Sequence, residues 1–169
     1  MVEKEQTVEQ TWAEVQNQYQ RRADLIPNLV NTVKGYASHE SSTLENVVKA
    51  RANATSINLN VEDLNEETLA KYQQAQGELS QALKSLLAVT EAYPDLKANE
   101  NFRDLQTQLE GTENREAVAR GRYTEAVKDY NAKIKKFPEV IYAGWFGFEK
   151  KPQFQAEAGA ERAPEVNFD

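Results

Sequence analysis

The sequence predicts an all-α fold, an antiparallel four-helix bundle with long helices. Hydrophobic residues recur every three or four positions over most of the 169 residues, which is the period of an amphipathic helix. In the second half of the chain a seven-residue spacing is sustained, and this favours helices packed lengthwise at shallow angles. With 40% hydrophobic residues and only 7 glycines and 5 prolines, the chain has enough apolar side chains for a core and few loop-forming residues.

The first helical pattern starts near residue 2 and continues to about residue 52, with Val8, Trp12 and Val15 in its apolar stripe. Pro27 lies inside this pattern, where a proline removes a backbone hydrogen bond and clashes with the preceding turn. We therefore expect this segment to be bent or broken near Pro27, in two pieces of about 25 residues that match the other helices in length. Residues 53–63, rich in Asn, Ser and Thr, are predicted to form a loop.

Two further helices complete the predicted bundle, one over residues 64–92 and one from about residue 98 to Phe137. The last helix carries the clearest heptad pattern, with an aromatic or leucine side chain at most of its seventh positions. Each of these helices ends at an aromatic residue followed by proline, which cannot continue a helix.

Aromatic residues beside glycines follow the last helix, and this composition indicates a non-helical strap folded onto one end of the bundle. The strap is an apolar cap of the core or, alternatively, an exposed patch for a protein or membrane-interface contact. Its candidate residues are Tyr142, Trp145, Phe146, Phe148 and Phe154. We expect a bundle domain over residues 1–156 and a flexible tail over residues 157–169.

Composition excludes several function classes. The net charge of −7 argues against non-specific nucleic-acid binding, which needs a basic surface. The chain has no cysteine, and its single histidine, His39, rules out the paired Glu-x-x-His motifs of di-iron bundles. We expect no catalytic residue, no metal and no cofactor. The longest apolar stretch, residues 140–148, is too short to span a bilayer.

Two polar clusters interrupt the apolar stripes. Their candidate residues are Arg21, Arg22, Asp24, Asn28 and Asn31 in the first, and Glu113, Asn114, Arg115, Glu116 and Arg120 in the second. Glu116 stands at a heptad position where leucine is expected, so it requires a cationic partner such as Arg22 or Arg51 from a facing helix. The clusters form either a structural network that fixes the register of the helices or an interaction site near Pro27.

Several motifs, in order, resemble the LemA family. They are Gln20 to Val30 (QRRADLIPNLV) with Lys34 to Glu40 (KGYASHE), Tyr93 to Asn99 (YPDLKAN), Glu113-Asn114-Arg115 with Ala119-Arg120, Tyr130-Asn131, Phe137-Pro138, and Gly147-Phe148 with Pro152-Gln153-Phe154. The resemblance implies a bacterial helical-bundle domain behind an N-terminal membrane anchor, which is a transmembrane helix or a lipid. It implies no catalytic activity, cofactor or substrate.

We therefore expect a non-enzymatic, membrane-tethered scaffold or adaptor at the cell membrane or envelope, whose partners are other membrane or envelope proteins. The alternative is a ligand- or peptide-sensing helical module, and an apolar cleft lined by Leu25, Tyr36 and Tyr123 would favour it. The heptad seam also leaves a homo-oligomer open.

Overall fold

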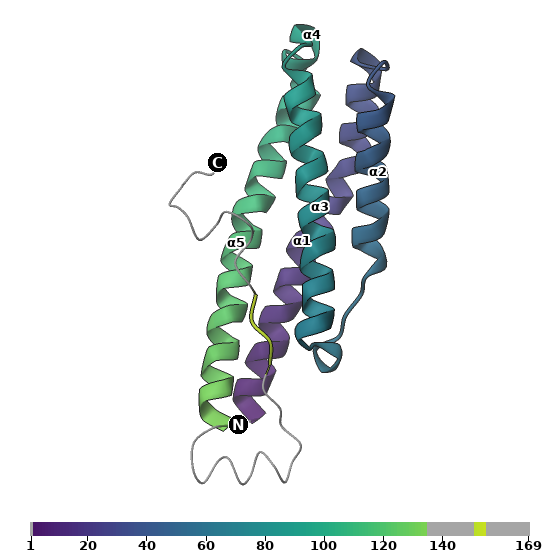
Figure 1. Ribbon diagram of the computed structural model, residues 1–169. Coiled ribbons are helices and arrows are strands. Elements are labelled where there is room, and N and C mark those ends of the chain that lie inside the picture. The colour runs from purple at the N-terminus through teal and green to yellow at the C-terminus, as the bar shows by residue number, and fades with distance from the viewer. Residues whose placement is uncertain (1, 135–150, 155–169) are drawn as a thin grey trace, which may run out of the picture.

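The computed structural model describes residues 2–134 and 151–154. In this part of the chain four long helices run alternately up and down. The first two form one helical hairpin and the last two form another, and the two hairpins lie side by side (Figure 1). The helices are α1 (Val2–Tyr36), α2 (Ser41–Ser56), α3 (Glu66–Thr90) and α5 (Glu100–Ile134). Two short elements, the 3-10 turn η1 (Val61–Asp63) and α4 (Pro94–Lys97), lie in the connections. The predicted all-α bundle is confirmed.

The break predicted near Pro27 is found at residues 37–40 instead. Helix α1 continues through Pro27 as one helix of 35 residues. Pro27 has no N–H for the carbonyl oxygen of Ala23, four residues earlier, but Arg51 Nε of α2 donates to that oxygen at 2.8 Å. A side chain from the neighbouring helix thus replaces the missing helical donor, which removes part of the penalty of the proline.

The displaced break gives the first two helices unequal lengths, where two equal pieces were predicted. Helix α1 has 35 residues and α2 has 16, so α1 is about 52 Å long and α2 about 24 Å. As a result α2 stands beside only the upper half of the bundle as drawn in Figure 1. It also ends at Ser56, four residues into the predicted loop.

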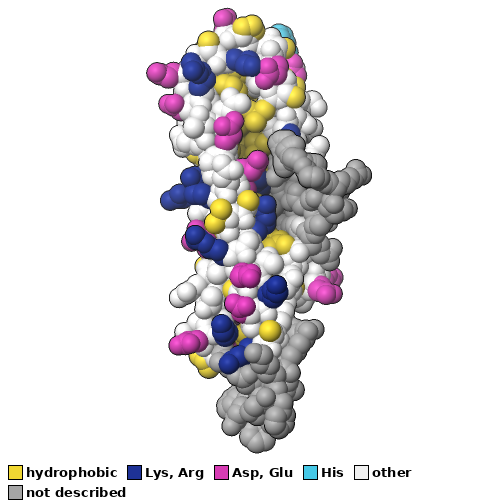
Figure 2. All heavy atoms as spheres, turned by 90° about the vertical axis from the view of Figure 1, so that its left-hand side faces the viewer, with side chains coloured by type: hydrophobic (Ala, Val, Ile, Leu, Met, Phe, Trp, Pro, Cys, Tyr) yellow, Lys and Arg dark blue, Asp and Glu magenta, His cyan; other side chains and the backbone are white. Residues whose placement is uncertain are grey.

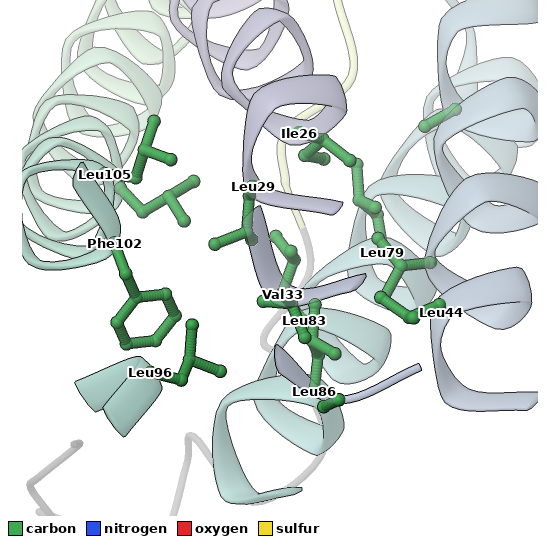
Figure 3. Packing of buried hydrophobic residues seen from close by; sticks show 14 of the residues in the cluster. Ile26, Leu29, Val33, Leu44, Leu79, Leu83, Leu86, Leu96, Phe102 and Leu105 are labelled. Carbon is green, nitrogen blue, oxygen red and sulfur yellow. The ribbon is translucent and has the colours of Figure 1, made fainter. Parts of the chain in front are cut away.

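An upper apolar cluster fills the half of the bundle that contains α2. Figure 3 shows Ile26, Leu29 and Val33 of α1 between leucines of α3 on one side and Phe102 and Leu105 of α5 on the other. All of these α1 side chains are at most 1% exposed. The apolar stripes predicted from the sequence therefore do face one another.

A lower apolar cluster fills the other half, where α2 is absent. Residues 57–65 cover this half, and the indole N–H of Trp12 donates to the carbonyl oxygen of Leu59 at 2.9 Å. Its buried members are Val8, Trp12, Val15, Tyr19, Leu64, Leu69, Tyr72, Ala119, Tyr123, Ala126, Val127, Tyr130 and Ile134. The Trp12 ring lies 5.1 Å from the Tyr72 ring and 5.5 Å from the Tyr123 ring, so aromatic packing replaces the missing helix.

At the upper end, polar side chains join the two hairpins. The hydroxyl of Tyr93 donates a hydrogen bond to Glu40 Oε2 at 2.9 Å. This hydrogen bond raises the pKa of Tyr93, and burial and the negative charge of Glu40 act in the same direction. Asn99 Nδ2 donates to the Tyr36 hydroxyl at 3.0 Å. Asn99 Oδ1 also accepts from the N–H of Phe102 and so caps the first turn of α5.

Among the described residues, no helix is both long and apolar enough to cross a membrane. The predicted boundary between a bundle domain and a tail after residue 156 lies outside the described residues, as does the predicted end of the last helix at Phe137.

Candidate functional site

The upper and lower apolar clusters meet at a layer of buried and half-buried polar side chains halfway along the bundle. We call Arg22 of α1, Gln76 and Ser80 of α3, and Glu116 of α5 the central polar layer. Arg22 is 4% exposed and Glu116 is 1% exposed. Two opposite charges are therefore held away from water between three helices, and each needs nearby partners to be stable there.

An ion pair forms the centre of this layer. Arg22 Nε lies 3.4 Å from Glu116 Oε2. The cationic partner that the sequence required for Glu116 is thus Arg22. The other candidate partner, Arg51, donates instead to the carbonyl oxygen of Ala23.

The remaining donors of the Arg22 guanidinium group are directed at α3. Nη1 donates to Ser80 Oγ at 2.6 Å, and Nη2 donates to both the main-chain and side-chain oxygens of Gln76, at 3.0 and 2.9 Å. The guanidinium carbon also lies 5.1 Å from the centre of the Tyr19 ring, a cation–π distance. One side chain of α1 therefore joins α3 and α5.

Two hydrogen bonds between α1 and α5 surround the layer. Arg120 Nη1 donates to the Tyr19 hydroxyl at 2.6 Å, and Arg115 Nε donates to Gln18 Oε1 at 3.3 Å. Burial raises the pKa of Tyr19, and the nearby Arg120 acts in the opposite direction. The hydroxyl of Tyr19 is therefore protonated at neutral pH and accepts the arginine's hydrogen bond as a neutral group.

The structure brings together four of the ten polar candidates, namely Arg22, Arg115, Glu116 and Arg120. The other six lie on exposed faces of α1 and α5, outside the layer: Arg21, Asp24, Asn28, Asn31, Glu113 and Asn114. Of these, Asp24 accepts a hydrogen bond from Gln20 of its own helix.

Four residues of the layer and its rim were not predicted from the sequence: Gln76 and Ser80 on α3, and Gln18 and Tyr19 on α1. One signal was present, because Tyr72, Gln76 and Ser80 follow one another at four-residue spacing. A polar pair at that spacing, continuing an apolar stripe, marks the buried face of α3.

The arrangement can hold helices in register, because the ion pair and the hydrogen bonds of Arg22 link three helices. In the described part of the chain, no three His, Cys, Asp or Glu side chains lie close enough together to hold a metal ion. A polar cleft of about 180 Å³ opens beside the layer, between Tyr19, Tyr72 and Gln76 on its inner side and Gln16 and Asn58 near its mouth.

The residues proposed to line a sensing cleft lie far apart in the bundle. Leu25 packs against the upper cluster, Tyr36 is 43% exposed at the upper end, and Tyr123 is fully buried in the lower cluster. These three side chains therefore do not enclose a common cleft.

Of the predicted aromatic strap, only Phe154 is described; Tyr142, Trp145, Phe146 and Phe148 lie outside the described residues. Phe154 packs edge-on against Tyr123, with ring centroids 5.6 Å apart. The segment Lys151 to Phe154 runs beside α5 along the lower half of the bundle (Figure 1).

The fold and the central polar layer define the chain as an all-α helical-bundle protein whose long helices are linked by polar side chains in its interior. A model of the LemA family matches residues 11–168. The chain belongs to the LemA family.

Two curated relatives are similar to part of the chain. They are the magnetosome proteins MamQ 1 and MamQ 2 of Paramagnetospirillum magneticum (strain ATCC 700264 / AMB-1), each 32% identical over 87 residues. The match covers 52% of this chain and 32% of each relative. The chain thus matches about a third of the length of these relatives.

Proposed function

We propose that the protein is a non-enzymatic, membrane-tethered scaffold or adaptor that binds other membrane or envelope proteins through the outside of its bundle. The observation that carries this proposal is the occupied interior. Two apolar clusters fill the described bundle, and the ion pair and three hydrogen bonds of Arg22 occupy the layer between them. The side chains that remain available for recognition are those on the surface.

The surface supports a role in protein contacts. Figure 2 shows the face that carries α5, where acidic and basic side chains are interspersed and hydrophobic atoms appear in narrow strips between them. Val118 of α5 is 53% exposed, and it borders a shallow groove of about 320 Å³ with Arg115 and Arg122 on one side and Glu14 on the other. Mixed charge around a small apolar centre is typical of non-obligate protein interfaces.

The membrane tether is proposed from the family and from the relatives. The resemblance to the LemA family implies an N-terminal anchor, and both curated relatives are named as proteins of the magnetosome. A tethered bundle with α1 and α5 each about 52 Å long would extend well away from a bilayer surface, where it can contact neighbouring proteins.

Site-specific photo-crosslinking of the complete protein in its own membranes tests the adaptor proposal. A photo-reactive residue replaces Val118 on α5 or, as the matched control, Val48 on α2, which is 50% exposed. We expect repeated capture of the same membrane or envelope protein from position 118 and not from position 48, identified by mass spectrometry. Capture of copies of the same chain alone, or identical weak capture from both faces, would contradict the proposal.

Membrane fractionation tests the tether separately. We expect the complete protein to remain in the membrane fraction after washes with high salt and alkaline carbonate, which remove proteins bound only by charge. Release by either wash would show that no anchor holds the protein.

A further inference from the structure

The lower half of the bundle holds the segment Lys151 to Phe154 through its main chain. The N–H of Lys151 donates to Asn131 Oδ1 at 2.9 Å, and Asn131 Nδ2 donates back to the Lys151 carbonyl oxygen at 3.0 Å. The hydroxyl of Tyr123 donates to the carbonyl oxygen of Pro152 at 3.0 Å. Three main-chain groups in succession are therefore bound by side chains of α5.

Side chains of the segment also contact the bundle. Pro152 is buried and Phe154, two residues later, is half-buried against Tyr123, whereas Gln153 between them is exposed. This alternation is that of an extended chain lying with one face on the bundle. Lys151 adds a contact, since its Nζ lies 5.9 Å from the centre of the Tyr130 ring.

The bundle side of this contact is also packed against other helices. Tyr123 is fully buried, and its ring is fixed against Trp12. Burial raises the pKa of Tyr123, so its hydroxyl is a neutral donor over the whole physiological range. With the segment in place this donor is buried, and the carbonyl oxygen of Pro152 accepts its hydrogen bond.

A groove continues beside the bound segment, between the beginning of α3 and the end of α5. It measures about 1020 Å³ and is bordered by Leu69, Ala70 and Gln73 of α3, by Ala132 of α5, and by Phe154 itself. The surface that could bind a peptide therefore extends beyond the part that residues 151–154 cover.

We infer that this surface, which we call the α3–α5 groove, is a recognition site for an extended peptide with proline and, two residues later, an aromatic side chain. The chain's own residues 151–154 occupy it as a built-in competitor. This inference deepens the adaptor function proposed above and rests on it, since it gives the adaptor a site and its partner a chemical class. The occupant is a peptide of another protein that carries the same spacing.

The built-in segment sets the affinity that such a partner must have. A short tethered ligand acts at an effective concentration of about 1 mM. A segment that stays bound under those conditions has, as a free peptide, a dissociation constant of about that value or lower. A longer peptide that also fills the groove would bind more tightly and displace it.

Binding of a synthetic peptide to the full-length chain tests the inference. The probe is a fluorescent peptide with the sequence of residues 149–155 (EKKPQFQ), and the receptor carries Pro152→Gly with Phe154→Ala to weaken its own segment. We expect saturable binding with a dissociation constant of about 1 mM or below. Binding to the unmodified chain should be weaker by about twofold if that constant is about 1 mM, and by more if it is lower, because the tethered segment competes at about 1 mM. A peptide with Gly and Ala in place of Pro and Phe should not bind.

Asn131→Ala in the same background should weaken peptide binding about tenfold, since it removes two hydrogen bonds. Asn114→Ala, an exposed asparagine of the same helix, is the matched control and should have no effect. The side-chain amide resonances of Asn131 supply an independent readout, because they should shift when the peptide is added. Circular dichroism and thermal melting verify that each variant is folded.

Failure of the weakened receptor to bind the peptide at several times 1 mM would overturn the inference. Equal binding of the peptide without Pro and Phe, or an unchanged affinity in Asn131→Ala, would overturn it as well. These outcomes differ from failure of the adaptor proposal, because partner capture at Val118 does not depend on the α3–α5 groove. Capture without peptide binding would remove only this site.

Discussion

Arg51 Nε donates a hydrogen bond to the carbonyl oxygen of Ala23 at 2.8 Å, four residues before Pro27. In an unbroken helix that oxygen would accept from the N–H of residue 27, which proline lacks. The donor comes instead from α2, 28 positions along the chain from Ala23. The contact explains how α1 passes Pro27 without a break, and it couples the path of α1 to the position of α2.

Arg51→Met should destabilise the protein by about 1–3 kcal/mol, because it leaves the Ala23 carbonyl oxygen without a donor in a partly buried site. Methionine keeps most of the apolar stem, so the loss reports mainly the hydrogen bond. The free energy of unfolding in urea measures it.

A double-mutant cycle with Pro27→Ala isolates the cause. Alanine at position 27 restores the helical N–H, so Arg51→Met should then be destabilising by much less than in the unmodified chain. Equal effects of Arg51→Met in both backgrounds would show that the side chain stabilises the protein through packing or charge and not through this hydrogen bond.

The ion pair of the central polar layer gives a second prediction. Glu116→Gln or Arg22→Met alone should destabilise the fold by about 3–5 kcal/mol, because each leaves the remaining charge buried without its counter-ion. The double variant Arg22→Met with Glu116→Leu should recover most of that loss, since well-packed apolar side chains can replace a buried ion pair.

Arg21→Met is the matched control for the ion pair, because Arg21 is the exposed neighbour of Arg22. Its effect should stay within about 0.5 kcal/mol. Urea unfolding of the four variants would contradict the prediction if Arg21→Met and Arg22→Met had equal effects, or if the double variant were less stable than either single one.

Much of the fold follows from local pattern. The apolar residues at helical spacing, such as Val8, Val15, Leu79 and Tyr123, are all buried in the structure. Their burial could be predicted because apolar residues at helical spacing form one face of a helix, and that face packs against the core. The break at residues 37–40 could not be predicted in the same way, because the effect of Pro27 depends on a distant arginine, Arg51.

Only part of the central polar layer could be predicted from the sequence, again because the rest depends on contacts between distant residues. Glu116 was detectable, since a charge at a heptad position is conspicuous and requires an opposite charge. Gln76 and Ser80 carried only the weaker signal of their four-residue spacing after Tyr72, because neutral polar residues are common on any helix surface and only the placement of Arg22 makes them partners. Residues 151–154 belong to the strap that was predicted to fold onto one end of the bundle, either as a cap or as an exposed contact patch. In the structure Asn131 and Tyr123 hold them beside α5.

Glycines inside α5 give a third prediction, which concerns backbone entropy. A Cβ built on Gly121 meets no atom within 4 Å, so Gly121→Ala should stabilise the protein by about 0.5–1 kcal/mol. A Cβ at Gly111 would lie 3.3 Å from Arg115 Nη1, so Gly111→Ala requires that guanidinium group to move and should stabilise less. The two midpoints of urea unfolding compare them directly.

If Gly121→Ala lowered the stability, the exposed face of α5 at that position would have to be covered by another molecule. Sedimentation of both variants would detect this, because loss of a contact between copies would change the sedimentation coefficient of Gly121→Ala alone.

Stability at alkaline pH gives the last prediction. Burial raises the pKa of Tyr19, Tyr72 and Tyr123 above the ordinary value of 10.0. Above pH 10 the unfolded chain therefore loses protons that the folded chain keeps, so the stability these residues contribute is complete below that pH and falls as the pH rises. Tyr72→Phe should reduce the slope of this fall by about 1.4 kcal/mol per pH unit, the value for one proton.

Tyrosinate absorbance at 295 nm, followed together with circular dichroism, measures this effect. The buried tyrosines should ionise only in the same step in which helicity is lost, because their anions cannot form in the apolar core while it is intact. Ionisation of every tyrosine near pH 10 with the helices intact would show that water reaches the lower cluster. It would also remove the reason for Tyr123 to remain a fixed donor to the segment at residues 151–154.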